Sequence, residues 1–271
     1  MFFYNNKDSK YFLYLLVLNN YEIIHNVMII SLPFYISNFL SCFIWNKAAR
    51  HRLRGYVNCF LYTPMMKRFI KKTFGEETKN IQFVRQNTPS RCVCVINDKY
   101  FIKIFKHDMG NRLADFKFLI DYITPFIKTT IPPVYVSKNN HMYVTKKIPG
   151  FGIYEFDKEF VLKHEPKILN QANKIIRELQ SIDVRKIPNA ERFCVALEST
   201  TKDIETEPLT NDSVLAHFDL NIRNFLFDSD LNICGLIDFD SMTITNDKNK
   251  DKEIFMKYWE RYKKSKRKHP H

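Results

Sequence analysis

The sequence predicts an α+β fold in which a small antiparallel sheet precedes a larger helical part. Strand patterns at residues 81–84, 92–96 and 100–105 are separated by turn-forming residues, as is typical of adjacent antiparallel strands. Residues 165–182 carry apolar side chains at helical spacing, which predicts a long helix with one buried face. A further strand, turn and strand pattern lies at residues 225–237. A chain of 271 residues is long enough for one such two-part domain.

Polar residues stand at both ends of the hairpin predicted at residues 225–237. His217 and Asp219 precede it, Asn224 opens it, and Asp238 follows its second strand. Because a hairpin brings its two ends back together, we expect Asn224 and Asp238 to lie close to one another. The alternative is a polar turn with a satisfied buried histidine and solvated acids at the loop ends.

Phosphoryl transfer requires groups of these types. One carboxylate must orient the attacking hydroxyl and accept its proton, while an amide oxygen and a second carboxylate hold the magnesium that neutralises the nucleotide phosphates. This chemistry assigns the catalytic base to Asp219 and the magnesium ligands to Asn224 and Asp238. His217 is expected to brace the loop. ATP and Mg²⁺ are therefore the expected cofactors.

The same residues carry a resemblance to a known family. The spacing His-x-Asp-x-x-x-x-Asn at residues 217–224, with Ile-Asp-Phe-Asp at 237–240, resembles the catalytic and metal-binding loops of the aminoglycoside phosphotransferase and choline kinase branch of the protein-kinase-like superfamily. The resemblance covers residues 81–245 and implies a two-lobed fold with a small antiparallel β lobe and a larger helical lobe. Residues 76–150 would form the small lobe and hinge, and residues 151–271 the larger lobe with a basic tail. In size and in the Ile-Asp-Phe-Asp sequence, the chain is also similar to bacterial lipopolysaccharide core kinases.

The resemblance also implies residues that bind the nucleotide phosphates. Lys103 lies in Tyr-Phe-Ile-Lys-Ile-Phe, which resembles the strand whose lysine holds the α and β phosphates in kinases. Its partner would be an acid on the next helix, for which Asp115 is the first candidate and Asp121 the alternative. Related kinases usually have a glutamate at that position, so the choice between the two aspartates stays open.

Two further segments resemble loops that contact the nucleotide. Ser90 lies in a loop at residues 85–91 that contains no glycine, although glycine allows backbone N–H groups their closest approach to a phosphate. The Ser90 hydroxyl can donate a hydrogen bond to a phosphate instead. Lys147 lies in Lys-Lys-Ile-Pro-Gly at residues 146–150. This sequence resembles the hinge between kinase lobes, where backbone groups meet the adenine edge.

Residues 1–75 are expected to form an apolar and basic helical extension. Residues 27–45 carry no formal charge, but the run is borderline for a membrane span, which needs about 20 predominantly apolar residues. Residues 56–74 alternate apolar groups with lysine and arginine, a pattern that can lie in a bilayer interface beside anionic headgroups. The alternative is a helical cap packed on the small lobe. The sequence leaves open whether translation starts at Met1 or Met28.

Charge and cysteine content indicate where the protein works and what it contacts. A net charge of +13 favours a polyanionic partner such as an anionic lipid surface, nucleic acid or a phosphorylated glycan, among which charge alone does not choose. No motif that reads nucleic acid is present, so no specific nucleic-acid partner is expected. The 6 cysteines form no C-x-x-C pair, and no cleavable signal heads the chain. We expect a cytoplasmic protein, peripheral on the inner face of the membrane.

These observations predict an enzyme, an ATP- and Mg²⁺-dependent phosphotransferase that acts on a hydroxyl acceptor. The basic flanks and the short segment after Asp240 favour a sugar of a bacterial surface glycan or lipopolysaccharide core as acceptor. Aminoglycoside and choline kinases generally carry a longer helical part there, and a small-molecule acceptor of their type is the alternative. A non-catalytic pseudokinase scaffold in glycan assembly is a third hypothesis, motivated by the loop without glycine.

Overall fold

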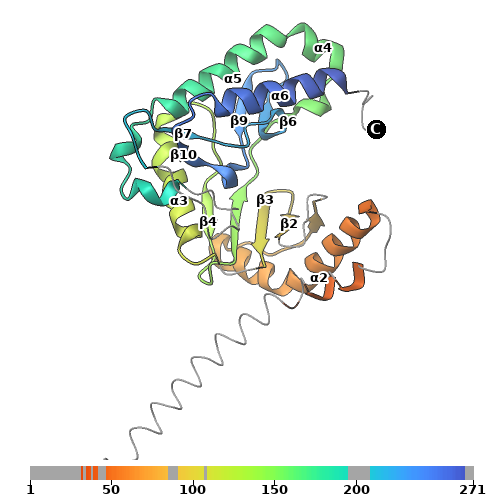
Figure 1. Cartoon of the computed structure of the whole chain (residues 1–271). Coiled ribbons are helices and arrows are strands. Elements are labelled where there is room, and N and C mark those ends of the chain that lie inside the picture. Colours follow the sequence, from red (N-terminus) through yellow and green to blue (C-terminus); the bar gives the residue numbers. More distant parts are fainter. Residues whose placement is uncertain are drawn as a thin grey trace, which may run out of the picture. The chain divides into compact units, whose positions relative to one another are not determined.

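The computed structural model describes residues 32, 35–37, 39–41, 47–84, 91–106, 109–194 and 208–265 (Figure 1). The chain divides into two compact units. The first comprises Met1–Gly110 and Val136–Val144, and the second comprises Asn111–Tyr135 and Thr145–His271. Strands and helices are both well represented, which confirms the expected α+β class. The expected boundaries at residues 75 and 150 stay a prediction.

A five-stranded sheet with the order β1-β2-β3-β5-β4 dominates the first unit, and the unit boundary passes through β4 and β5. Its strands are β1 (Ile81–Phe83), β2 (Arg91–Ile96), β3 (Tyr100–Phe105), β4 (Val134–Val136) and β5 (Met142–Lys146). β2 pairs antiparallel with both β1 and β3, and Val93 lies opposite Lys103. Asn97 and Asp98 both have φ of 54°, the left-handed conformation of a tight hairpin turn. The three strands predicted at residues 81–105 and their turn are thus confirmed.

Helix α2 (Lys47–Phe74) lies against β1 and β2 in the same unit (Figure 1). Tyr62, Met66 and Ile70 recur at helical spacing and are buried, so they form the face that packs on the sheet. The ring of Phe74 stacks on Tyr100 of β3, with ring centroids 4.3 Å apart. The expected helix at residues 56–74 is confirmed, and its buried face packs as a cap on the strands.

The expectation of a membrane span concerns residues 27–45. Within the described part of the chain, no helix has the length and apolar character that crossing a membrane requires. Most of residues 27–45 lie outside that part, so the expectation stays a prediction.

The second unit contains most of the helices and two small sheets. Its α-helices are α3 (Arg112–Ile123), α4 (Lys158–Lys163), α5 (Glu165–Gln180) and α6 (Lys250–Lys264). Its 3-10 helices are η1 (Thr124–Phe126), η2 (Ile153–Glu155), η3 (Val184–Lys186), η4 (Ala190–Phe193), η5 (Ile222–Asn224) and η6 (Phe239–Ser241). The sheets are β6-β8-β9, formed by Phe151–Gly152, Phe225–Phe227 and Ile233–Leu236, and β7-β10, formed by Val214–Ala216 and Thr243–Thr245.

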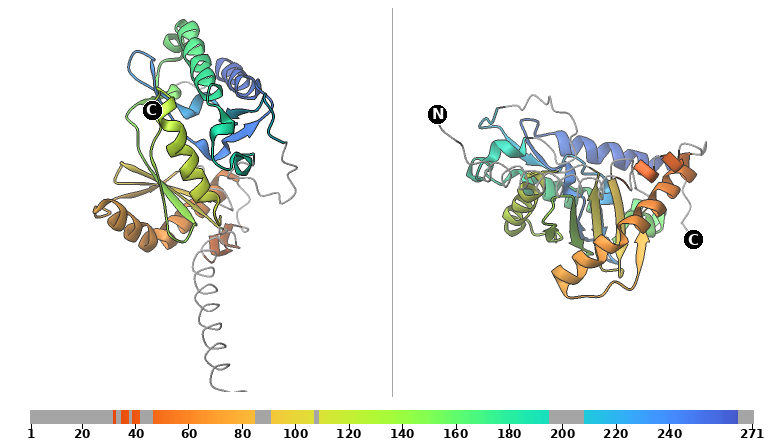
Figure 2. Two further views of the ribbon diagram at one scale, coloured as in Figure 1. Left: turned by 90° about the vertical axis from the view of Figure 1, so that its left-hand side faces the viewer. Right: turned by 90° about the horizontal axis from the view of Figure 1, so that it is seen from below.

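Helices α5 and α6 run side by side (Figures 1 and 2). The predicted apolar stripe of α5 is confirmed, because its buried residues are Ile168, Ala172, Ile175, Ile176 and Leu179. Trp259 of α6 is fully buried, and its Nε1 donates a hydrogen bond to Glu165 Oε1 at 2.6 Å. The sequence of residues 257–271 predicts a basic aromatic helix that fades into a charge run. In the structure, α6 extends to Lys264 and its aromatic residues are buried in the second unit.

Gly150 lies where the chain leaves β5 and passes the hairpin of β8 and β9. Its φ is +145°, which residues with a side chain rarely adopt. A Cβ at this position would lie 2.8 Å from Cys234 Sγ and 3.0 Å from Leu226 Cβ. Both the backbone conformation and the close approach of β8 and β9 therefore require glycine here.

We expect Gly150→Ala to lower the free energy of unfolding by more than about 2 kcal/mol, because backbone strain and steric overlap add. Gly110→Ala is the matched control, since Gly110 also has a positive φ, of +52°, but no atom lies within 4 Å of the place that its methyl group would take. The control should cost about 1 kcal/mol. Urea unfolding of the two variants measures the difference, and equal costs would contradict a role for the contacts with β8 and β9.

Candidate active site

The candidate site begins where strand β7 ends. All residues of β7 are buried, and His217 follows this strand directly. Residues 217–224 then lead into the hairpin of β8 and β9, whose strands pair antiparallel. Asp228 closes the turn, because its Oδ1 accepts hydrogen bonds from the N–H groups of Asp230 and Asn232 at 3.0 and 2.8 Å. The predicted hairpin is confirmed.

A buried carboxylate fixes the backbone at the start of this loop. Asp251, in the first turn of α6, accepts hydrogen bonds from the N–H groups of His217 and Phe218, both at 2.8 Å. Asp251 is 1% exposed. Phe218 has φ of 64°, a left-handed conformation that a bulky residue keeps only where its surroundings hold it. The two hydrogen bonds to Asp251 hold the loop in that conformation.

Sequence reasoning missed Asp251. An acid in the first turn of a helix is usually solvated, where it complements the helix dipole. Asp251, however, lies in register with Phe255, Trp259 and Tyr262, which are all buried. An acid at the head of a buried apolar stripe is the signal that could have identified it. Burial raises the pKa of the Asp251 carboxyl above its ordinary value, while the charge of His217 and the two backbone hydrogen bonds act in the opposite direction.

The ring of His217 ties the loop to the segment around Asp238. His217 is fully buried, and its Nε2 lies 3.1 Å from the carbonyl oxygen of Ile237. A carbonyl oxygen can only accept, so Nε2 carries the proton and donates it to this bond. The centroid of the His217 ring lies 4.7 Å from that of Phe239. This geometry fits the bracing role expected of His217.

Asp219 and Asn224 belong to one hydrogen-bonded loop. Asn224 Nδ2 donates to the carbonyl oxygen of Asp219 at 2.8 Å. Asn221 Nδ2 donates to Asp219 Oδ1 at 3.1 Å and thereby orients the carboxylate. Asp219 is half-buried, whereas Asn224 is buried. Because the Asn224 amide directs its nitrogen at Asp219, its Oδ1 is the atom that a cation could use.

Asp238 is brought back to the start of the hairpin. The N–H of Ile237 donates to the carbonyl oxygen of Asn224 at 2.9 Å, so the residue before Asp238 is bonded to the residue that opens the hairpin. Asp238 has φ of 66° and ψ of 54° and begins η6. Such left-handed non-glycine residues are uncommon and gather at functional sites. The structure therefore brings the loop of Asp219 and Asn224 together with the segment of Asp238.

The oxygen donors of this loop suit a magnesium ion that binds together with a nucleotide. Mg²⁺ prefers oxygen ligands and commonly takes one or two from the protein, with phosphates and water completing the octahedron. Asn224 Oδ1 and the Asp238 carboxylate match that pattern. Neither in this loop nor in any other described part of the chain do three or more His, Cys, Asp or Glu residues form a group that could hold a metal ion. The donor set fits an ion shared with phosphates better than a closed metal site made by the protein alone.

The residues expected to contact the nucleotide lie on other segments. Lys103 lies on β3 in the first unit, with its Nζ 5.8 Å from the centre of the Tyr143 ring. Lys147 follows β5 and is exposed. Ser90 lies outside the described residues, so its role stays a prediction.

Both acids expected as partners of Lys103 have basic neighbours in the second unit. Asp115 Oδ1 lies 3.7 Å from Arg192 Nη1. Asp121 forms an ion pair with Lys117 one helical turn earlier. Lys103 belongs to the first unit and both acids to the second, so the choice between them stays a prediction. The sequence did not indicate the proximity of Arg192 to Asp115.

Solved structures share this fold, although no protein-family model and no curated protein matches the sequence. The streptomycin–ATP ternary complex of APH(2")-IIa has a TM-score of 0.52 at 14% identity, covering 74% of this chain and 84% of that one. ADP-bound aminoglycoside phosphotransferase APH(2")-Ib has a TM-score of 0.52 at 15% identity, covering 74% and 82%. The gentamicin complex of APH(2")-IIa has a TM-score of 0.50 at 15% identity, covering 74% and 81%. The fold is therefore the two-lobed protein-kinase-like fold of aminoglycoside phosphotransferases, as the sequence resemblance implies.

We expect Asp251→Ala to lower the free energy of unfolding by about 2–4 kcal/mol, because the N–H groups of His217 and Phe218 lose their acceptor inside the protein. Glu253→Ala is the matched control. It removes the same charge from the same first turn of α6, but Glu253 is exposed. Urea unfolding gives the free energies, and hydrogen exchange of residues 215–220 should accelerate only in Asp251→Ala. Equal effects of the two substitutions would show that Asp251 does not anchor the loop.

Proposed function

We propose that this protein transfers the γ-phosphoryl group of ATP to a hydroxyl acceptor in a Mg²⁺-dependent reaction. The observation that carries the proposal is the hydrogen-bonded loop in which the hairpin brings Asp238 back to Asp219 and Asn224. The likeness to the phosphotransferase complexes with ATP and ADP supports it. The alternative of a polar turn with a buried histidine and solvated acids does not account for the burial of Asn224.

Each side chain of the loop takes a role that its surroundings support. Bound Mg²⁺ and ATP supply the phosphoryl group and the neutralisation of its charge. Asp219 orients the acceptor hydroxyl and accepts its proton as the oxygen bonds to the γ-phosphorus and ADP leaves. Asn224 and Asp238 provide the oxygen atoms that hold the cation. His217 is a positioning residue, since it touches the loop backbone.

The nucleotide contacts are part of the same proposal. Lys103 holds the α and β phosphates, and Asp115 is its partner, with Asp121 as the alternative. Ser90 donates to a phosphate, and the backbone beside Lys147 meets the adenine edge. The place of Lys103 on an inner strand of the sheet, between β2 and β5, supports its assignment.

Asp219→Asn should lower kcat by about 10²- to 10⁴-fold while leaving ATP affinity unchanged, because it removes only the proton acceptor. Asp238→Asn should instead abolish the Mg²⁺ dependence of ATP binding, because it removes a ligand of the cation. Isothermal titration calorimetry with and without Mg²⁺, together with ADP release, measures both effects.

Asp230→Asn is the matched control for both variants, since Asp230 is an exposed acid in the turn of the same hairpin. It should behave as the unmodified protein. Equal loss of ATP binding in Asp219→Asn and Asp238→Asn would contradict the separate roles. Absence of ATP binding in the unmodified protein would favour the pseudokinase scaffold.

For the acceptor, we propose a sugar of a bacterial surface glycan or lipopolysaccharide core. The net charge of +13 supports an acceptor that carries phosphate or acidic groups. Similarity in size and in the sequence of residues 237–240 to lipopolysaccharide core kinases supports it as well. A small-molecule acceptor is the second candidate, favoured by the streptomycin and gentamicin complexes among the structures of similar fold.

Transfer of labelled phosphate from ATP should be detected with core oligosaccharide as acceptor and should be absent with streptomycin, gentamicin and choline. Asp219→Asn provides the blank, because its proton acceptor is gone. Transfer to an aminoglycoside or to choline alone would replace the glycan proposal by the small-molecule one without affecting the assignment of the loop.

We also propose that the first unit contacts an anionic membrane surface at the inner face. Large apolar side chains are exposed at helical spacing before α2, namely Leu32, Tyr35, Ile36, Phe39 and Leu40. On α2 itself Phe60 is 78% exposed, and Lys67 and Arg68 of the same helix are exposed and add positive charge. Exposed apolar groups together with basic side chains suit a bilayer interface that contains anionic lipid.

Phe39→Ser should lower binding to vesicles containing phosphatidylglycerol by about three- to tenfold, because it removes an apolar side chain that would enter the interface. Phe126→Ser is the matched control, since Phe126 of the second unit is similarly exposed, at 55% against 65% for Phe39. Co-sedimentation with vesicles measures the bound fraction. Equal binding of both variants and the unmodified protein would rule out this membrane contact.

A further inference from the structure

A cavity of about 340 Å³ lies within the second unit, between α3, η4 and the residue that follows η6. Asp115, the proposed partner of Lys103, lines it, but none of the residues proposed for catalysis or magnesium binding does. Its charged lining residues are Arg112, Asp115 and Arg192, and its apolar lining residues are Phe116, Leu119, Phe193 and Met242. The volume is at the lower end of the range of about 300–1,000 Å³ that is typical of small-molecule sites.

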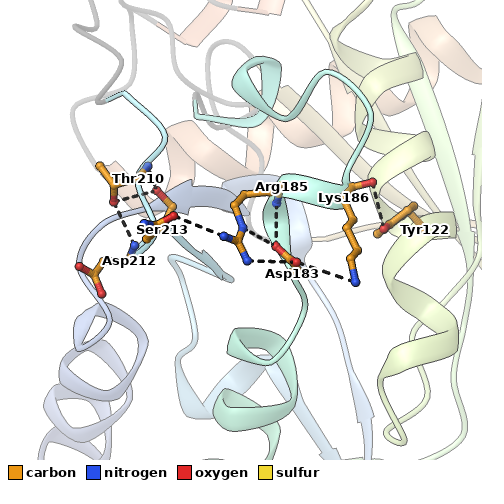
Figure 3. Close-up of polar contacts among 8 residues, drawn as sticks. Tyr122, Asp183, Arg185, Lys186, Thr210, Asp212 and Ser213 are labelled. Atoms are coloured by element: carbon orange, nitrogen blue, oxygen red, sulfur yellow. Dashed lines mark hydrogen bonds and ion pairs between the residues drawn. The ribbon is translucent and has the colours of Figure 1, made fainter.

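The walls of the cavity are fixed by contacts outside it. Tyr122 of α3 donates from its hydroxyl to the carbonyl oxygen of Lys186 in η3 at 3.3 Å (Figure 3). The Thr243 hydroxyl donates to the carbonyl oxygen of Phe193 at 2.8 Å in a buried position, which holds η4 on β10 beside Met242. These contacts within the protein hold the cavity walls in place, so a ligand would not have to organise them.

The charges at the cavity favour an anion. Two guanidinium groups line it against one carboxylate. The ion pair of Arg192 with Asp115 is long, at 3.7 Å, and its side chains are 56% and 28% exposed. Partly exposed pairs of this kind contribute little, so Arg192 can turn to an incoming anion at small cost. Burial lowers the pKa of Arg112 below its ordinary value, but a guanidinium stays charged at neutral pH.

The rest of the lining favours an apolar body. Phe116, Leu119, Phe193 and Met242 are each buried, with exposed fractions of 7%, 2%, 5% and 4%. Two aromatic rings and a methionine side chain offer flat and adaptable apolar contacts. A ligand with charge alone would make no use of this apolar surface, and a ligand with an apolar body alone would make no use of the positive charge of Arg112 and Arg192.

We propose that this cavity binds a small amphipathic oxyanion, in which a phosphate or carboxylate group meets Arg112 and Arg192 and one aromatic or branched aliphatic group fills the apolar part. Bidentate pairing of guanidinium with such an oxyanion is the strongest polar contact that these residues can make. Met242 closes η6, the 3-10 helix that Asp238 opens. An occupant that contacts Met242 therefore touches the segment that carries the proposed magnesium ligand.

The test uses the full chain and calorimetric titration with phenyl phosphate and with 3-phenylpropionate. Inorganic phosphate supplies the charge without the body, and 2-phenylethanol supplies the body without the charge. At least one of the two amphipathic anions should bind, at least about tenfold more tightly than inorganic phosphate and 2-phenylethanol. Which of them binds more tightly identifies the head group. The proposal would be overturned if inorganic phosphate bound as tightly as the amphipathic anions, or if neither amphipathic anion bound.

Arg192→Gln should lower the affinity for the more tightly bound amphipathic anion by about tenfold, which is the effect of losing one charge-assisted hydrogen bond. Arg185→Gln is the matched control, because Arg185 is an exposed arginine of η3 that pairs with Asp183 outside the cavity (Figure 3). It should leave the affinity unchanged. An equal loss in both variants would show that only the general charge of the protein attracts the anion, which overturns the proposal.

The location is tested with protein carrying ¹³C-labelled methionine methyl groups. The signal of Met242, assigned with Met242→Leu, should shift on titration with the anion, while that of Met142 in the first unit should not. Saturating ATP should leave the Met242 shift intact. Loss of the shift with ATP would assign the cavity to the nucleotide site and overturn the proposal, and it would leave the phosphotransferase proposal standing.

Discussion

The buried carboxylate of Asp251 is the interaction on which the candidate site depends. It accepts the two N–H groups with which the loop begins, and it holds Phe218 in a left-handed conformation. Further hydrogen bonds link the rest of the loop. The ring of His217 donates to the carbonyl oxygen of Ile237, and the N–H of Ile237 donates to the carbonyl oxygen of Asn224. The side chain of Asn224 donates to the carbonyl oxygen of Asp219. These hydrogen bonds connect Asp251 to Asp219 in one continuous series.

A buried carboxylate at position 251 has a cost in folding free energy. Burying it disfavours its charge, as its raised pKa reflects. An apolar residue of similar size would avoid that cost, yet it could accept neither N–H group, and both would lie unpaired inside the protein. Few side chains can accept two neighbouring backbone N–H groups at once, so the loop geometry constrains the residue at position 251 closely. In this sense the site includes a helix that contributes none of the groups proposed for catalysis.

The parts of the fold that could be predicted are those whose signals are local in the sequence. The hairpin at residues 225–237, the strands of the first sheet and the stripe of α5 each follow from residue spacing within one element, and the structure confirms them. Spacing within α6 could have identified Asp251 as a buried acid, but it could not identify the partners of Asp251, because they lie more than thirty residues earlier and only tertiary packing unites them. The proximity of Arg192 to Asp115 is of the same kind. The aromatic residues of α6 are visible in the sequence, but their burial depends on tertiary packing.

The place of Asp251 in the chain bears on how the protein is made. Chains emerge from the ribosome from the N-terminus onward, and regions fold as soon as their partners are available. Asp219, Asn224 and Asp238 are synthesised before α6, so the nascent loop contains all three before the carboxylate that anchors it exists. An mRNA truncated before the codon for Lys250 would encode a fragment that contains Asp219, Asn224 and Asp238. That fragment would lack the Asp251 carboxylate, which holds the start of the loop. The presence of all three motif residues in such a fragment would therefore not mean that its loop is folded as in the full chain.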